Sequence, residues 1–127
     1  MNMRRLAELP LFQGLDERAL QTIGRAVREN SVEEGRVLVR EGDYSDVVTI
    51  IDEGTARVEH EGEVVAELGP GDVFGEAGLI GKSQRNANVV AATDMRLITL
   101  DTFDVNRLSG EHPQLKARLQ ELSASRS

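Results

Sequence analysis

Between about residues 31 and 100, the chain consists of short β-branched and apolar runs separated by glycine-containing turns. The run Val47–Ile51, for example, ends at Asp52-Glu53-Gly54, and residues 56–61 alternate with a period of two. Many short strands with turn residues at regular spacing are typical of sandwiches, rolls and barrels. Residues His60-Glu61-Gly62-Glu63 are predicted to form a hairpin turn. This region therefore restricts the fold class to a mainly β architecture.

The residues before this region follow a helical pattern. Apolar side chains recur at helical spacing, but Pro10 and Gly14 interrupt them. We therefore expect two short helices here, the second capped at its N-terminus by Asp16.

The residues after this region are also predicted to be helical. Asp101 or Thr102 is suited to cap a short helix that Ser109-Gly110 would end. A last helix follows, and leucines line one of its faces, a pattern that indicates packing. Whether this leucine face packs on its own roll or on a second subunit is left open; its members are Leu115, Leu119 and Leu122.

The chain has 127 residues, a length that fits one domain. We expect a single domain covering residues 1–127. Within it, helices should occupy about 3–29, the β region about 31–100 and C-terminal helices about 101–123.

Composition excludes several classes of function. The formal net charge of −7 disfavours binding to the phosphate backbone of nucleic acids. The start of the chain lacks a signal-peptide pattern, and no apolar run approaches a membrane span, so we expect a cytoplasmic protein without membrane contact. Cysteine is absent, and the two histidines, His60 and His112, have no neighbours at metal-ligand spacing, so we expect no metal cofactor.

One segment, residues 71–89, does not follow a simple strand pattern. Its four glycines would let the backbone approach a bound molecule closely. A helical turn at 76–80 would direct N–H groups at an anion, and the guanidinium of Arg85 can bind two phosphate oxygens. Glu76 is suited to accept a hydrogen bond from a sugar hydroxyl. Together these groups indicate a site for a phosphate and a ribose.

The same segment resembles the phosphate-binding cassette of the cyclic nucleotide-binding domain family, and the resemblance covers roughly residues 11–122. The matching cassette residues are Phe74-Gly75-Glu76, Leu79-Ile80, Arg85-Asn86-Ala87 and Val89. The matching residues upstream are Gly35, Glu41-Gly42, Gly54 and Gly71-Asp72.

The resemblance implies an eight-stranded antiparallel, jelly-roll-like β-roll with N-terminal helices, a short helix in the cassette and C-terminal helices. It implies that Glu76 accepts the ribose 2′-hydroxyl and that Arg85 pairs with the cyclic phosphate. Backbone N–H groups of Asn86 and Ala87 would add phosphate contacts, and Gly75 would allow close approach to the sugar. The implied ligand-binding set is Phe74, Gly75, Glu76, Ala77, Arg85, Asn86 and Ala87, with Val58, Val65, Leu68 and Phe74 beside the base.

The resemblance further implies a non-catalytic sensor whose ligand is cAMP, with cGMP as the alternative. Asn86 stands where cGMP-preferring relatives often have threonine and some cAMP binders have alanine or serine. Binding would move the cassette together with the last helix and signal to a separate, unidentified effector protein. A homodimer is left open.

Three other functions remain to be compared with this one. A roll that binds no ligand could serve as an interaction scaffold, although Glu76 and Arg85 argue against it. A cupin-like metal enzyme needs a cluster of histidines that the sequence lacks. A DNA-binding regulator is disfavoured by the net charge and by the lack of a helix-turn-helix pattern.

Overall fold

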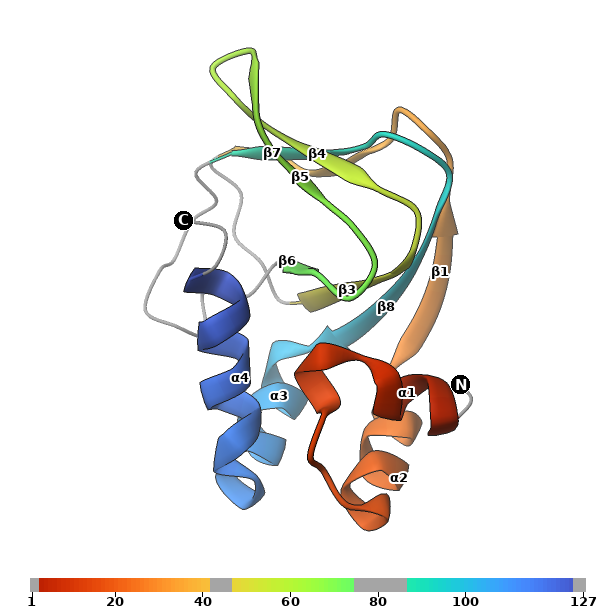
Figure 1. Ribbon diagram of the computed structural model, residues 1–127, viewed down its shortest axis with the longest axis vertical. Helices are drawn as coiled ribbons and strands as arrows, with labels where there is room; N and C mark the ends of the chain where they lie inside the picture. Colours follow the sequence, from red (N-terminus) through yellow and green to blue (C-terminus); the bar gives the residue numbers. More distant parts are fainter. Residues whose placement is uncertain (1–2, 42–46, 75–86, 125–127) are drawn as a thin grey trace.

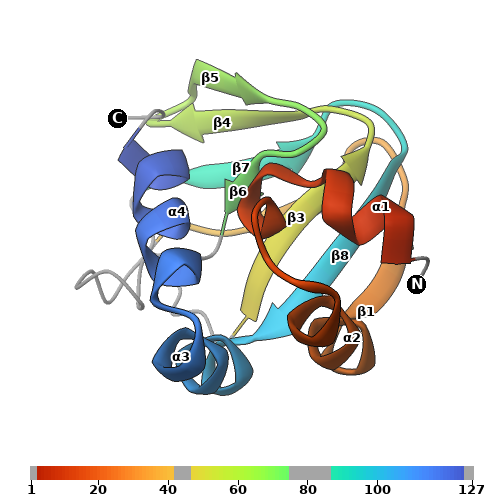
Figure 2. The ribbon, with the colours of Figure 1, turned by 60° about the horizontal axis from the view of Figure 1, so that its bottom comes forward.

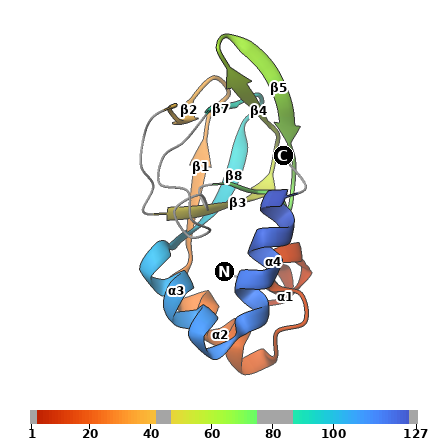
Figure 3. The ribbon, with the colours of Figure 1, turned by 90° about the vertical axis from the view of Figure 1, so that its left-hand side faces the viewer.

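The computed structural model describes residues 3–41, 47–74 and 87–124. These residues form a β-roll of two four-stranded antiparallel sheets, with helices from both ends of the chain gathered at one end of the roll (Figures 1 and 3). The predicted fold class is confirmed. The helix expected within the cassette lies outside the described residues.

Each sheet is assembled from strands that are distant in sequence. The first sheet has the order β1 (Arg28–Val32), β8 (Met95–Asp101), β3 (Val47–Glu53) and β6 (Val73–Phe74). The second sheet has the order β2 (Val37–Val39), β7 (Asn88–Ala91), β4 (Ala56–His60) and β5 (Glu63–Leu68). Strands β1 and β6 are therefore the edges of the first sheet, and β2 and β5 the edges of the second.

The N-terminal helices follow the predicted break at Pro10. They are α1 (Met3–Glu8), a short 3-10 helix η1 (Pro10–Phe12) and α2 (Glu17–Ala26). Asp16 caps α2 as expected, because its carboxylate accepts a hydrogen bond from the Ala19 N–H at 2.8 Å. The sequence predicts helices to about residue 29, whereas the structure ends α2 at Ala26 and begins β1 at Arg28. Val27 has extended backbone and packs against the helical core, so tertiary contacts determine this boundary.

The C-terminal helices are α3 (Thr102–Glu111) and α4 (Pro113–Ala124). Asp101 caps α3 by accepting the Phe103 N–H at 2.7 Å. Leu115 and Leu119 of α4 are each 1% exposed and belong to the same apolar cluster as Leu11 and Phe12. The leucine face of the last helix therefore packs on its own molecule.

Two apolar cores lie on opposite faces of the first sheet. The helices lie against one face of the first sheet (Figure 2). The first core is formed between them, and Val48 and Ile50 of β3 contribute to it. The second core lies between the two sheets, inside the roll, and Ile51 and Leu97 contribute to it. Strand alternation explains this division, because neighbouring residues of a strand point to opposite faces.

The predicted hairpin between β4 and β5 is confirmed. The φ angles of Glu61 and Gly62 are 52° and 83°, so both central residues are left-handed, as a type I′ turn requires. Such turns match the twist of the two strands that they join.

Candidate functional site

The structure describes half of the predicted ligand-binding set. Phe74, Ala87, Val58, Val65 and Leu68 lie within the described residues. The remaining five, together with the cassette segment between them, lie outside the described residues and have no structural account: Gly75, Glu76, Ala77, Arg85 and Asn86.

Three of the five described residues come together inside the roll. Phe74 is 4% exposed and Leu68 is 2% exposed, and both belong to the core between the sheets. Val58 is half-buried and packs against the same core. The two sheets therefore bring these side chains into one buried apolar cluster directly beside the start of the predicted cassette.

Val65 is placed differently from these three. Its exposed fraction is 58%, and it occupies a β-bulge, since Val58 pairs with Ala66 while Glu59 pairs with Val64. A bulge changes the direction of one side chain relative to regular alternation. Alternation of apolar residues alone does not reveal this bulge.

A hydrogen bond lies just after the other end of the predicted cassette. Ala87 is half-buried and precedes Asn88, whose side-chain oxygen accepts the Glu41 N–H at 2.6 Å. The Glu41 carboxylate lies 3.5 Å from Nδ1 of His60, at the end of β4. Three segments thus meet where the chain re-enters the second sheet. In the sequence Glu41 is part of the family pattern, and no local signal marks Asn88.

A tight turn fixes the chain just before the cassette. The Asp72 carboxylate accepts the Gly69 N–H at 2.7 Å, and the Asp72 N–H donates to the Gly69 carbonyl at 3.0 Å. Gly71 has a φ of 90°, in the region that favours glycine, and its N–H donates to the Ile51 carbonyl at 2.7 Å. These bonds hold the turn to β3 and determine where Val73 and Phe74 begin.

Pro10 connects this turn to the last helix. A methyl group added at Gly71 would lie 3.1 Å from Cδ and Cγ of the Pro10 ring, so the turn and η1 are in close contact. The Arg118 guanidinium of α4 donates to the Pro10 carbonyl at 3.4 Å and to the Gln13 side chain at 3.5 Å. A continuous set of contacts therefore runs from the start of the predicted cassette through η1 to α4.

An ion pair between Arg5 and Asp52 anchors α1 to β3. The Arg5 guanidinium binds the Asp52 carboxylate and also donates to the Asp52 carbonyl at 2.8 Å. Asp52 is only 7% exposed and lies at a register shift of β3. The hydrogen bond to Asp52 is the main reason that the pKa of Arg5 is raised above its ordinary value.

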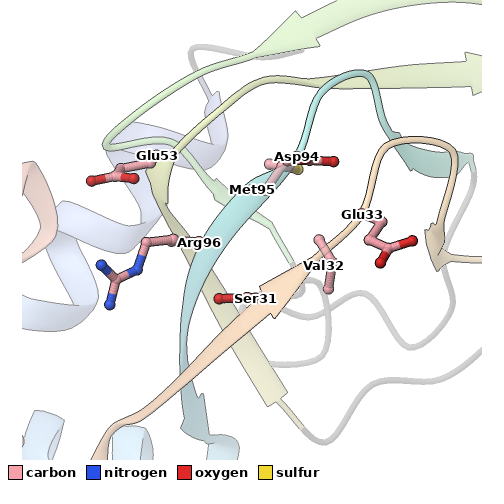
Figure 4. Close-up of a pocket in the computed structure, with 7 residues that line it drawn as sticks. All are labelled: Ser31, Val32, Glu33, Glu53, Asp94, Met95 and Arg96. Carbon is pink, nitrogen blue, oxygen red and sulfur yellow. The ribbon is translucent and has the colours of Figure 1, made fainter.

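A shallow groove of about 360 Å³ lies away from the predicted ligand residues (Figure 4). It is found where β1 ends and β8 begins, and none of the predicted ligand residues contributes to it. Its lining residues are Ser31, Val32, Glu33, Glu53, Asp94, Met95 and Arg96.

Neither metal binding nor membrane insertion finds support in the part of the chain that the structure describes. Within residues 3–41, 47–74 and 87–124, no three or more histidine or acidic side chains gather in a way that could hold a metal ion. None of the helices in these ranges is both long and apolar enough to span a bilayer.

The two sheets and the helices at one end define the class of protein as a helix-capped β-roll domain. The sequence matches the family described as "Cyclic nucleotide-binding domain" over residues 29–112. A cyclic nucleotide-gated potassium channel of Rhizobium etli is 37% identical over 125 residues, which cover 98% of this chain and 35% of the channel. The chain therefore belongs to the cyclic nucleotide-binding domain family.

Other relatives agree with this assignment. A cAMP-dependent protein kinase regulatory subunit of Schizosaccharomyces pombe is 38% identical over 106 residues, covering 83% of this chain and 26% of the relative. The chain thus spans about a quarter to a third of the length of these curated relatives.

Solved structures have the same fold. The regulatory domain of Toxoplasma gondii PKA, crystallised with cAMP, is 34% identical with a TM-score of 0.74, over 84% of this chain and 42% of that one. A cyclic nucleotide-binding protein from Geobacter metallireducens has a TM-score of 0.83 at 22% identity, over 98% of this chain and 94% of that one, and supports the fold alone.

Proposed function

We propose that this chain is a non-catalytic receptor for a cyclic nucleotide, with cAMP as the favoured ligand and cGMP as the alternative. Family membership supports a cyclic nucleotide. The names of two relatives support cAMP, since one is a regulatory subunit of a cAMP-dependent kinase and the other was crystallised with cAMP.

The observation that carries the proposal is the position of the two ends of the predicted cassette. The last described residue before it, Phe74, belongs to the core inside the roll, and so does Val89, two residues after Ala87. The two described ends of the predicted cassette therefore lie at the roll interior, beside Leu68 and Val58. Apolar side chains next to a segment predicted to bind an anion would suit a molecule with a flat base and a phosphate.

Within this arrangement we assign the polar contacts to the cassette. Arg85 would bind the cyclic phosphate as a fork of two N–H donors, and Glu76 would accept the ribose 2′-hydroxyl. Backbone N–H groups of Asn86 and Ala87 would add phosphate contacts, and Gly75 would let the sugar approach the chain. Ala77 would line the same segment.

We further propose that binding is transmitted to α4. A ligand shifts an equilibrium only if it binds two states unequally, so some element must change position when the cassette closes. The contacts of Pro10 with Gly71 and Arg118 provide a route from the cassette to α4. A separate effector protein would then recognise the changed position of α4.

Calorimetric titration tests the proposal. cAMP and cGMP should bind, whereas the linear 5′-AMP and 5′-GMP should bind more weakly because their phosphates differ in shape and charge. Arg85→Ala should weaken cAMP binding by about 2–5 kcal/mol, the usual range for removing one partner of a buried charge contact. Arg107→Ala is the matched control, since Arg107 is an exposed arginine of α3 that pairs with Asp104 at 3.4 Å.

Three results would contradict the proposal. No heat with either cyclic nucleotide would favour the alternative of an interaction scaffold without a ligand. Unchanged cAMP affinity in Arg85→Ala would remove the site assignment. Metal in elemental analysis of the purified protein would revive the alternative of a cupin-like enzyme.

A further inference from the structure

One of the four edge strands differs from the others in regularity. Within the described residues β6 spans two positions, and the pairing of β2 shifts between Val37 and Val39. The pairing of β5 shifts at Val65. Short length and bulges protect sheet edges from pairing with another chain. By contrast, β1 pairs with β8 in an unbroken register over all five of its residues.

The outer side of β1 is open to solvent. Its first four residues are exposed and its last is half-buried. Figure 1 shows β1 along the right-hand side of the roll, with β8 on its inner side and no other described strand beyond it. Its outward N–H and C=O groups can therefore pair with another strand.

The two ends of this edge carry opposite charges. Arg28 begins β1, while the groove described above lies at its other end and includes the carboxylates of Glu33, Glu53 and Asp94. Figure 4 shows Glu33 and Asp94 projecting to one side of the strands and Glu53 and Arg96 to the other. Within the described residues, neither Arg28 nor Glu33 has an ion-pair partner within 4 Å.

We infer that a second copy of this chain pairs with β1, strand to strand and antiparallel, to form a symmetric dimer. Antiparallel pairing brings the positive end of each strand to the negative end of the other. Because the same patch is used twice, the contact closes on itself and forms a dimer rather than a filament. The two first sheets would join into one continuous sheet across the interface.

Charge selects one register for this pairing. A two-fold axis perpendicular to the sheet leaves each side chain on the same face of the sheet in both copies. Side chains directly opposite one another must share a face, so the allowed registers differ by shifts of two residues along the strand. With Asn30 opposite the partner's Asn30, Glu29 faces the partner's Ser31. A step in one direction places Glu29 opposite the partner's Glu29, and a step in the other places it opposite the partner's Glu33. Like charges directly opposite are destabilising, so the Asn30 register is favoured.

In this register the cation of each strand lies at the negative end of its partner. Arg28 lies opposite the partner's Val32, which lines the groove. Glu33 follows Val32 directly and is directed to the other face, so the attraction is between the charged ends of the strands and not a specific pair of Arg28 with Glu33.

The net charge of −7 per chain opposes association, and the dimer should therefore respond to salt. At about 0.15 M salt the Debye length is roughly 8 Å, so repulsion between the two molecules as a whole is largely screened while the direct contacts of the edge remain. We expect a dimer that strengthens when the NaCl concentration rises from 20 to 150 mM.

Sedimentation velocity of the 127-residue chain over a range of protein concentrations tests the inference. The wild-type chain should dimerise, and Asn30→Lys and Asn30→Asp should each weaken the dimer at least tenfold. Each variant alone places two like charges opposite one another at the symmetry axis. An equimolar mixture of the two should restore the dimer, because lysine then faces aspartate.

Mixing the two variants distinguishes a loss of strand pairing between copies from a defect in the fold of each variant. Both variants lose the hydrogen bond from the Asn30 amide to the Thr99 hydroxyl, so a fold defect would persist in the mixture. Val64→Lys is the matched control, since it adds a charge to an exposed valine of the edge strand β5 and should leave the dimer unchanged. A wild-type chain that stays monomeric at all concentrations and salt levels would overturn the inference, as would a mixture no more dimeric than its components.

Discussion

Arg5 shows how one exposed side chain can support a buried one. Its side chain is 39% exposed, yet its guanidinium binds the carboxylate and carbonyl of the buried Asp52. Arg5→Met keeps the apolar stem but leaves Asp52 without these donors. We expect the free energy of unfolding to fall by about 1–2 kcal/mol, in the lower part of the range for an unsatisfied buried group because water can reach the site. Urea denaturation at neutral pH measures the change.

The control for this prediction is Arg107→Met, which removes an exposed pair on α3 and should change the free energy of unfolding by less than about 0.5 kcal/mol. Arg5 is charged in both the folded and the unfolded state at neutral pH, because the ordinary pKa of arginine is strongly alkaline and Asp52 raises it further in the folded state. Its contribution should be constant up to strongly alkaline pH and be lost only as the pH rises through the raised pKa. Equal effects of the two substitutions would contradict the anchoring role of Arg5.

Gly71 and Gly35 form a matched pair for testing the turn before the cassette. Both have a φ of 90°, but an added methyl group would meet the Pro10 ring at 3.1 Å only at Gly71, while at Gly35 it would meet nothing within 4 Å. Each alanine substitution should lose roughly 1–2 kcal/mol from the left-handed backbone. Gly71→Ala should lose about 1 kcal/mol more from crowding.

Both variants should lose stability, but only Gly71→Ala should also lose affinity for cAMP. Calorimetry should show weaker cAMP binding for Gly71→Ala, whose turn precedes the cassette, and unchanged binding for Gly35→Ala. If the two variants lose the same stability and the same affinity, the contact between the turn and η1 has no role.

At the scale of elements, α4 is attached to its own molecule. Leu119 is 1% exposed, and Leu119→Ala should lower the free energy of unfolding by about 2–5 kcal/mol through the cavity that it leaves. Lys116→Ala, on an exposed position of the same helix, should have little effect. Urea denaturation at two protein concentrations should give the same loss for Leu119→Ala. A loss that depends on concentration would mean that a second subunit provides the packing.

Sequence patterns predicted most elements because they report local geometry. Alternation and Glu61-Gly62 identified the hairpin, and Asp16 identified the start of α2. The bulge at Val65 could not be predicted, since it depends on how two strands pair. The end of α2 at Ala26 depends on Val27 entering a core made by distant segments.

The same distinction applies to the candidate site. Motif spacing predicts the cassette, most of which lies outside the described residues, and of the residues predicted beside the base, Val58, Leu68 and Phe74 come together in the roll. The contacts that hold the cassette region in place were not visible in the sequence. Arg5 with Asp52, Asn88 with Glu41, and Pro10 with Arg118 each join positions far apart along the chain, and no local pattern marks such pairs.

At the scale of the whole molecule, ligand binding should stabilise the fold. A ligand that binds only the folded state adds about 2.7 kcal/mol at a concentration of 100 times its Kd. Thermal unfolding with cAMP should therefore show a higher Tm than with equal 5′-AMP, and Arg85→Ala should remove the shift. A shift of the same size in Arg85→Ala would show that cAMP binds elsewhere.

Strand β6 has only two residues, Val73 and Phe74, and they belong to different cores, one beside the helices and one inside the roll. The chain length between the Asp72 turn and the cassette is consequently fixed. One inserted residue would exchange the two faces and direct the aromatic ring towards the helices. Insertions should be tolerated at the solvent-exposed tip formed by Glu61 and Gly62, whereas no change in length is compatible with the fold at this short strand.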